Sequence, residues 1–173
     1  VVELAKHLDI TQTSAIEALT GFTGAARRLE TVFEGEDRTG IVDFAHAPSK
    51  VKASVHAVKE AHPDRKLIAV LELHTYSSLN KDFLKNYRGT LDHADSIYVF
   101  YSPETLKIKR LPTLSKDIIN NEMGREDIEV HTDPAELFKV LRAIDYTNSN
   151  LLMMSSGAFG KSDVRKITHK LLE

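Results

Sequence analysis

The sequence predicts an α/β protein with a mostly parallel β-sheet that helices cover on both faces. Along most of the chain, short apolar segments typical of strands alternate with segments of helical periodicity, and this alternation favours a parallel sheet. Residues 66–73 form a nearly continuous apolar run, which is typical of a strand buried on both faces. Together these observations predict a three-layer, Rossmann-like arrangement.

The expected elements follow from the period of the apolar residues and from the turn and capping residues between them. Strands are expected at 27–33, 40–44, 66–73, 97–101, 128–131 and 150–155. Helices are expected at 1–8, 11–19, 49–62, 80–91, 115–123 and 162–172. A further helix begins after Asp133, where an acidic N-cap precedes a proline and a glutamate. Ile16 and Leu19 are expected to face inward, and 107–114 has no clear assignment.

Composition bounds the class of protein. The chain has 173 residues, of which 42% are apolar and 28% are charged, as in a folded domain with a substantial core. Its net charge of −2 and its lack of a basic face argue against a nucleic-acid partner. No apolar run approaches the about 20 residues of a membrane span, so no membrane partner is expected. The absence of cysteine excludes disulfides, zinc–thiolate sites and thiol nucleophiles, and is consistent with a cytoplasmic location.

The stretch 42–49, Val-Asp-Phe-Ala-His-Ala-Pro-Ser, carries the main functional signal. An apolar strand leads into it and helical spacing begins at Val51, so Asp43 and His46 are expected in a loop between a strand and a helix. The start of a helix has unpaired N–H groups and a partial positive charge, which suit an anion such as phosphate. An alternative remains open, in which Asp43 only caps a turn and His46 only packs.

Polar side chains follow several of the expected strands. They are Asp43 and His46; Glu72, His74, Tyr76 and Ser77; Ser102 and Glu104; and the residues of 155–160. In a parallel sheet these positions meet at one edge, beyond the carboxyl ends of the strands, where ligands bind. Scattered loop polarity explains part of the pattern, but an acid such as Glu72 just inside a buried strand favours a ligand-facing edge.

Several catalytic motifs are missing from the sequence. It has neither a G-x-x-x-x-G-K-[ST] phosphate loop nor G-x-G-x-x-G after the first strand, and 157–160 is only a weak glycine signal. The eight histidines are dispersed without metal-site spacing, so a metal held wholly by this chain is not expected. The sequence shows no nucleophile with an evident base, so the chain alone is not an obvious catalyst.

Three blocks of the sequence together resemble the C-terminal domain of the Mur ligases, the ATP-dependent enzymes that form amide bonds in peptidoglycan synthesis. They are 24–30, with Arg28-Leu29-Glu30 similar to the family's Arg-x-Glu; 43–48, similar to its Asp-aromatic-small-His-x-Pro loop; and 154–160, similar to the murein peptide ligase branch. The resemblance spans 22–173, and the L-alanine-adding branch is next closest. Residues 1–21 resemble the end of the central ATP-binding domain, with a hinge near 21–24, so we expect the chain to be part of a longer protein.

The resemblance implies roles for individual residues. Arg28, Asp43 and His46 would contact ATP, with Asp43 hydrogen-bonded to the ribose and His46 near the phosphates. Two loops would shape the pocket for the incoming amine, and their residues are His74, Thr75, Tyr76, Ser77 and Ser78, and Ser155, Gly157, Phe159 and Gly160. Mg²⁺ would accompany ATP, but its ligands and the UDP-sugar pocket are expected mostly in the preceding domains. No catalytic residue is expected in this chain, which should be inactive by itself.

The implied function is ligation of a peptide, L-Ala-γ-D-Glu-meso-diaminopimelate, to UDP-N-acetylmuramate through an acyl phosphate in peptidoglycan recycling. Thr75 and Ser78 stand where the alanine-adding branch has arginines, the natural clamp for a carboxylate, and this argues for a peptide substrate. Lys107, Lys109 and Arg110 could bind its further carboxylates, although a short basic run is more often a solvated loop. The alternatives are an L-alanine-adding ligase, a non-catalytic nucleotide-responsive binding domain, and a ligase outside peptidoglycan such as a folate polyglutamylating enzyme.

Overall fold

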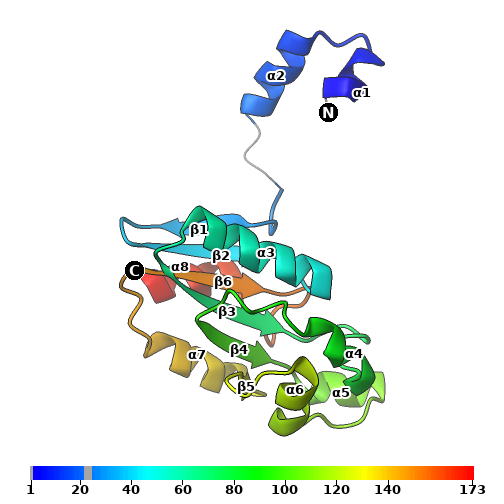
Figure 1. The fold of residues 1–173 in the computed structure, drawn as a ribbon, viewed down its shortest axis with the longest axis vertical. Coiled ribbons are helices and arrows are strands. Elements are labelled where there is room, and N and C mark those ends of the chain that lie inside the picture. Colours follow the sequence, from blue (N-terminus) through cyan, green and yellow to red (C-terminus); the bar gives the residue numbers. More distant parts are fainter. Residues whose placement is uncertain (1, 22–24) are drawn as a thin grey trace.

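The computed structural model describes residues 2–21 and 25–173. Among these described residues, six strands form one sheet in the order β1-β2-β6-β3-β4-β5 (Figure 1). The strands are β1 (Glu30–Glu34), β2 (Arg38–Asp43), β3 (Lys66–Glu72), β4 (Ser96–Phe100), β5 (Glu129–His131) and β6 (Ser149–Met154). β1 is antiparallel to β2, and the other neighbouring strands are parallel. The predicted α/β fold with a mostly parallel sheet is therefore confirmed.

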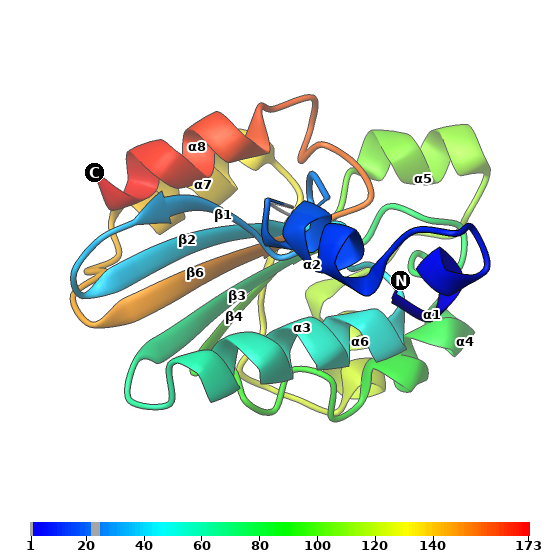
Figure 2. The ribbon, with the colours of Figure 1, turned by 90° about the horizontal axis from the view of Figure 1, so that it is seen from above.

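Helices cover both faces of this sheet. The helices are α1 (Val2–Lys6), α2 (Gln12–Thr20), α3 (Pro48–Ala61), α4 (Lys81–Leu84), the 3₁₀ turn η1 (Lys85–Tyr87), α5 (Pro103–Lys109), α6 (Lys116–Met123), α7 (Pro134–Arg142) and α8 (Val164–Leu172). Figure 2 shows α3 and α6 on one face, with α7 and α8 on the other. Among the described residues, no helix has the length and apolarity that a membrane crossing requires.

The two faces of β3 build two separate cores. Leu67, Ala69 and Leu71 point into the core under α3, α4 and α6. Ile68 and Val70 point into the core under α7 and α8. Side chains alternate across a strand, so a strand between two helical layers needs apolar residues at every position. This explains the continuous apolar run in the sequence.

Two helical segments differ from the sequence prediction. The helix expected at 80–91 is only α4 followed by η1, because Arg88 leaves the helical conformation with ψ of 130° and Gly89 follows with a left-handed φ of 72°. The region with no clear assignment contains part of α5. Its start has a capping signal, in which the Ser102 side chain accepts a hydrogen bond from the Thr105 amide and Pro103 occupies the first helical position.

The first two helices lie apart from the sheet in Figure 1. The expectation that Ile16 and Leu19 face inward is wrong, because their side chains are 46% and 39% exposed. The small residues Ala5 and Ala15 are buried instead. Two short helices that pack mainly on each other have no third layer to cover their larger apolar side chains.

Gly40 in β2 provides a test of how closely α8 packs on the sheet. A Cβ atom added there would lie 2.6 Å from Leu172 Cδ1 and 3.0 Å from Thr168 Cγ2. We therefore expect Gly40→Val to lower the free energy of unfolding by about 1–3 kcal/mol, measured by urea denaturation. Gly21→Ala is the control, since its new Cβ meets nothing closer than the Ala18 carbonyl oxygen at 4.0 Å. Equal stability of the two variants would contradict the close packing of α8 on β2.

Candidate functional site

The carboxyl ends of the central strands meet at one edge of the sheet. Asp43 of β2 and Leu71 of β3 both lie opposite Met154 of β6, and Glu72 lies opposite Phe100 of β4. The loops after β2, β3 and β6 therefore leave the sheet side by side. This is the edge at which the sequence predicted that polar residues would gather.

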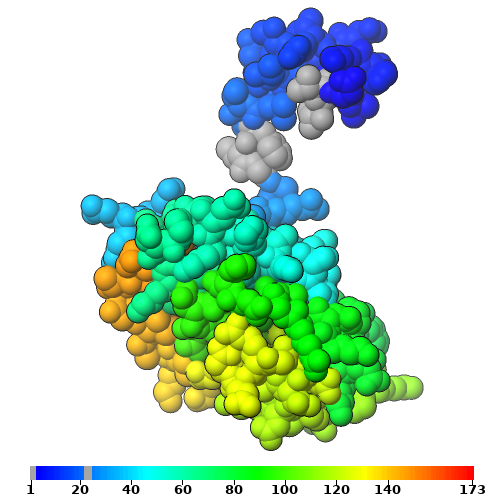
Figure 3. Space-filling model, in the orientation of Figure 1, coloured from blue at the N-terminus to red at the C-terminus, as the bar shows by residue number. Residues whose placement is uncertain are grey.

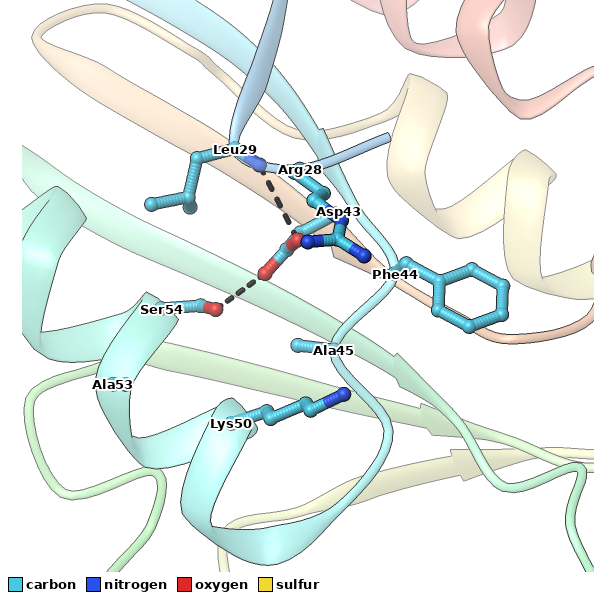
Figure 4. A pocket seen from close by; sticks show the side chains of 8 residues that line it. All are labelled: Arg28, Leu29, Asp43, Phe44, Ala45, Lys50, Ala53 and Ser54. Carbon is cyan, nitrogen blue, oxygen red and sulfur yellow. Dashed lines mark hydrogen bonds between the residues drawn. The ribbon is translucent and has the colours of Figure 1, made fainter. Parts of the chain in front are cut away.

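A pocket of about 290 Å³ opens at this edge between β2, α3 and the segment before β1 (Figure 4). Its lining residues are Arg28, Leu29, Asp43, Phe44, Ala45, Lys50, Ala53 and Ser54. Two of the three predicted ATP contacts, Arg28 and Asp43, are thus brought together in one cavity. Two cations and one carboxylate share this small space with apolar side chains, a combination that suits a phosphorylated ligand with a hydroxyl-bearing portion.

The Asp43 carboxylate forms the polar wall of the pocket. It is only 7% exposed. One oxygen accepts a hydrogen bond from the Leu29 amide at 3.2 Å and the other accepts one from the Ser54 hydroxyl. A buried carboxylate needs such partners, and each oxygen still has a second lone pair for a ligand donor. Asp43 therefore links Leu29, before β1, to Ser54 on α3 across the pocket. It does more than cap a turn.

Lys50 is a pocket residue that the sequence reasoning missed. Its side chain extends into the cavity from the first turn of α3 (Figure 4). A cation there faces the positive end of the helix dipole, which is unfavourable unless an anion lies nearby. The helix has no acidic residue in its first turn, and the N-cap Ala47 makes no side-chain cap bond. A lysine in the first turn after the Ala-Pro pair was the available sequence signal.

His46 lies in the loop before α3 but is not among the residues that line the pocket. Its ring nitrogen Nδ1 is 2.9 Å from the Phe44 carbonyl oxygen, and its ring packs edge-on against Phe44. The Tyr87 hydroxyl donates a hydrogen bond to the His46 carbonyl oxygen, and burial raises the pKa of Tyr87 to about 12. His46 thus keeps a half-buried ring beside the pocket, held by its own loop.

Glu72 holds the loop of residues 155–160 that follows β6, here called the glycine loop. It is 3% exposed, and one carboxylate oxygen accepts hydrogen bonds from the Ser155 hydroxyl and from the Phe159 amide. Gly157 packs so closely that an added Cβ would lie 2.6 Å from this oxygen and 2.9 Å from the His74 ring. The carboxylate is therefore occupied in shaping the loop, although it lies at the expected edge.

Three of the residues predicted to contact the amine substrate are engaged in the structure of their own loops. The Phe159 side chain is fully buried against Phe100 and Phe138, so it anchors the loop from below. Thr75 and Ser78 bond mainly to each other and close a tight turn.

The remaining predicted substrate contacts have some accessible surface. They are the half-buried His74 and Gly157 and the exposed Tyr76, Ser77 and Gly160. Ser155, by contrast, is buried and its hydroxyl is bonded to Glu72. Tyr76 also lies under the Lys109 ammonium, which is 4.0 Å from the ring centroid. Among the described residues, no group of three His, Cys, Asp or Glu side chains is placed to hold a metal ion.

The fold and the pocket define a class of protein, a Rossmann-like α/β domain with a cationic pocket beside a buried carboxylate at its carboxyl edge. The sequence matches the family described as "Mur ligase, glutamate ligase domain" over residues 27–157. This match covers more than half of the chain, and the chain belongs to this family. The family resemblance predicted from the three sequence blocks is confirmed.

Several known proteins are similar to this chain in sequence or in fold. The chain is 28% identical over 172 residues to the UDP-N-acetylmuramate–L-alanine ligase of Limosilactobacillus reuteri, covering 99% of this chain and 36% of that protein. The fold is similar to the UDP-N-acetylmuramate–alanine ligase of Thermotoga maritima, with a TM-score of 0.72, 20% identity and coverage of 99% and 35%. It is also similar to a murein peptide ligase from Psychrobacter arcticus, with a TM-score of 0.66, 21% identity and coverage of 99% and 34%. The chain spans about a third of the length of each of these proteins.

Glu72→Gln tests whether this carboxylate holds the glycine loop. We expect the free energy of unfolding to fall by about 1–3 kcal/mol and the Phe159 amide to exchange faster with solvent, because hydrogen bonds to a charged acceptor are replaced by weaker ones. Urea denaturation and amide hydrogen exchange measure the two effects. Glu104→Gln, at an exposed position on α5, is the control. If the two variants behaved alike, the loop would not depend on Glu72.

Proposed function

We propose that the chain is the C-terminal domain of an ATP-dependent ligase that joins the peptide L-Ala-γ-D-Glu-meso-diaminopimelate to UDP-N-acetylmuramate in peptidoglycan recycling. The observation that carries the proposal is the pocket in which Arg28 and Lys50 face the buried Asp43 carboxylate. Two of these residues belong to the sequence blocks that resemble the Mur ligases. Family membership supports the ligase class.

In this proposal each pocket residue has a distinct task toward ATP. Arg28 and Lys50 supply positive charge for the phosphates, and the partial positive charge of the helix dipole at the start of α3 adds to it. Asp43 accepts a hydrogen bond from a ribose hydroxyl while it remains held by Leu29 and Ser54. His46 approaches the ligand only if its loop moves, because its ring now contacts Phe44.

ATP would supply the phosphoryl group that activates a carboxylate as an acyl phosphate. The task of this domain is then to orient the nucleotide and the amine and to exclude water from the reactive anhydride. The described residues offer no metal-binding cluster, so we propose that Mg²⁺ is held mainly by the preceding domain and by the phosphates of ATP. The isolated chain is expected to be inactive for the same reason.

Residues 1–21 are proposed to be the end of the central ATP-binding domain, and 22–173 to be the C-terminal domain. The exposed apolar side chains of the first segment support this division; they are Leu4, Leu8, Ile10, Ile16 and Leu19. Apolar surface of this kind is normally covered by a neighbouring element. The proposed partners are thus the rest of that domain, UDP-N-acetylmuramate and a murein peptide, and the proposed location is the cytoplasm.

The turn at Thr75 and Ser78 bears on the amine substrate. Neither side chain carries a guanidinium, the clamp that a small amino acid's carboxylate favours, and both hydroxyls are engaged in closing their own turn. This supports a larger peptide as the amine. The L-alanine-adding activity is the second candidate, because the Limosilactobacillus reuteri relative carries that name.

Lys50→Ala in the full-length protein tests the nucleotide pocket. We expect the KM for ATP to rise about tenfold with a smaller change in kcat, because one phosphate contact is lost. Lys52→Ala is the matched control, since Lys52 is an exposed lysine on the same helix and does not line the pocket. A steady-state assay of ADP release measures both. If the two variants had identical KM values for ATP, the proposal that this pocket binds the nucleotide would be contradicted.

The substrate is tested by ADP release from the full-length protein with UDP-N-acetylmuramate and either the tripeptide or free L-alanine. Turnover with the tripeptide alone is the expected result. Turnover with alanine alone would assign the second candidate function. The absence of turnover with either substrate would favour a nucleotide-responsive binding domain or a ligase that acts outside peptidoglycan.

A further inference from the structure

The side chain of Arg27 joins the two loops of the candidate site. Its terminal nitrogen Nη2 donates hydrogen bonds to the carbonyl oxygens of Ser155 at 2.8 Å and Gly157 at 2.9 Å. Its guanidinium also lies over the Phe44 ring, with the central carbon 5.3 Å from the ring centroid. A single residue before β1 thus contacts the loop after β2 and the glycine loop after β6.

The main chain of Arg27 is fixed as firmly as its side chain. Its amide donates to the Glu30 carboxylate at 2.8 Å, and its carbonyl oxygen accepts from the Phe44 amide at 2.7 Å. Arg27 and Leu29 both have left-handed backbones, with φ of 56° and 43°. Non-glycine residues adopt this conformation only where surrounding contacts hold them.

This turn gives the two adjacent arginines different surroundings. Arg28 lines the nucleotide-side pocket, and the next amide, that of Leu29, donates to Asp43. Arg27 is bound to the glycine loop instead. The position of Arg28 in the pocket therefore depends on a turn that Arg27 anchors to the opposite loop.

We propose that Arg27 is a positioning residue that holds Arg28 and the glycine loop in a fixed position relative to each other. The nucleotide pocket and the glycine loop, which is assigned to the amine substrate, then form together. The assignment of these two sides rests on the proposed function, whereas the coupling between them does not. Lysine is not equivalent to Arg27 in this position, because its ammonium lacks the planar face that lies over the Phe44 ring while Nη2 donates to the two carbonyl oxygens.

Amide hydrogen exchange in the 173-residue chain tests the coupling without reference to activity. We expect Arg27→Gln and Arg27→Lys to speed exchange at both Leu29 and Phe159 by about fivefold or more, because each amide belongs to one of the two joined segments. Arg165→Gln is the matched control, since Arg165 pairs with the same Glu30 but does so from α8. Unchanged exchange at Leu29 or at Phe159 in the Arg27 variants would overturn the proposal.

A double-mutant cycle in the full-length protein tests whether Arg27 acts through Arg28. Arg27→Gln should raise the KM for ATP by about fivefold in the wild-type background and by less than about twofold in an Arg28→Ala background. Equal effects in the two backgrounds would show that Arg27 contributes only to general stability, and would overturn the positioning role. If Arg28→Ala alone left the KM for ATP unchanged, the nucleotide assignment would fail, and hydrogen exchange would still decide the coupling.

Discussion

Burial of the central strands on both faces is the constraint on which the rest of the structure depends. Every residue of β6 is buried, as is every residue of β3 after the first. Strands between two apolar layers accept few polar side chains along their length. The polar groups of the site are therefore confined to the strand ends, and parallel pairing brings those ends to one edge of the sheet.

Two buried carboxylates at this edge have different tasks. Asp43 uses one oxygen for a main-chain donor and the other for a hydroxyl donor, and it remains part of the pocket wall. Glu72 directs one oxygen to two donors of the glycine loop, and Gly157 packs directly upon it. Both satisfy the requirement that a buried charge be hydrogen-bonded. Asp43 in addition faces a cavity that can hold a ligand.

The parts of the fold that the sequence predicted well have strong local signals. The start of α7 was recognised from an acidic N-cap and a proline, and the structure places the Asp133 side chain on the Ala135 amide. Ser102 and Pro103 carry a comparable signal for α5, but the sequence prediction did not include this helix. Burial in the first two helices was mispredicted, since periodicity identifies an apolar stripe but does not reveal whether any layer covers it.

The sequence by itself determined the alternation of strands and helices and the edge where polar residues such as Asp43 gather. These features follow from local periodicity and from the geometry of parallel sheets, whereas the part of Arg28 in the site was implied by the resemblance to the Mur ligases. Only the tertiary structure decided that Lys50 shares their pocket, that Phe159 points into the core, and that Arg27 binds the glycine loop. The contacts of Arg27 join residues 128 and 130 positions apart. The direction of its side chain is set by a left-handed turn and distant packing, neither of which sequence spacing specifies.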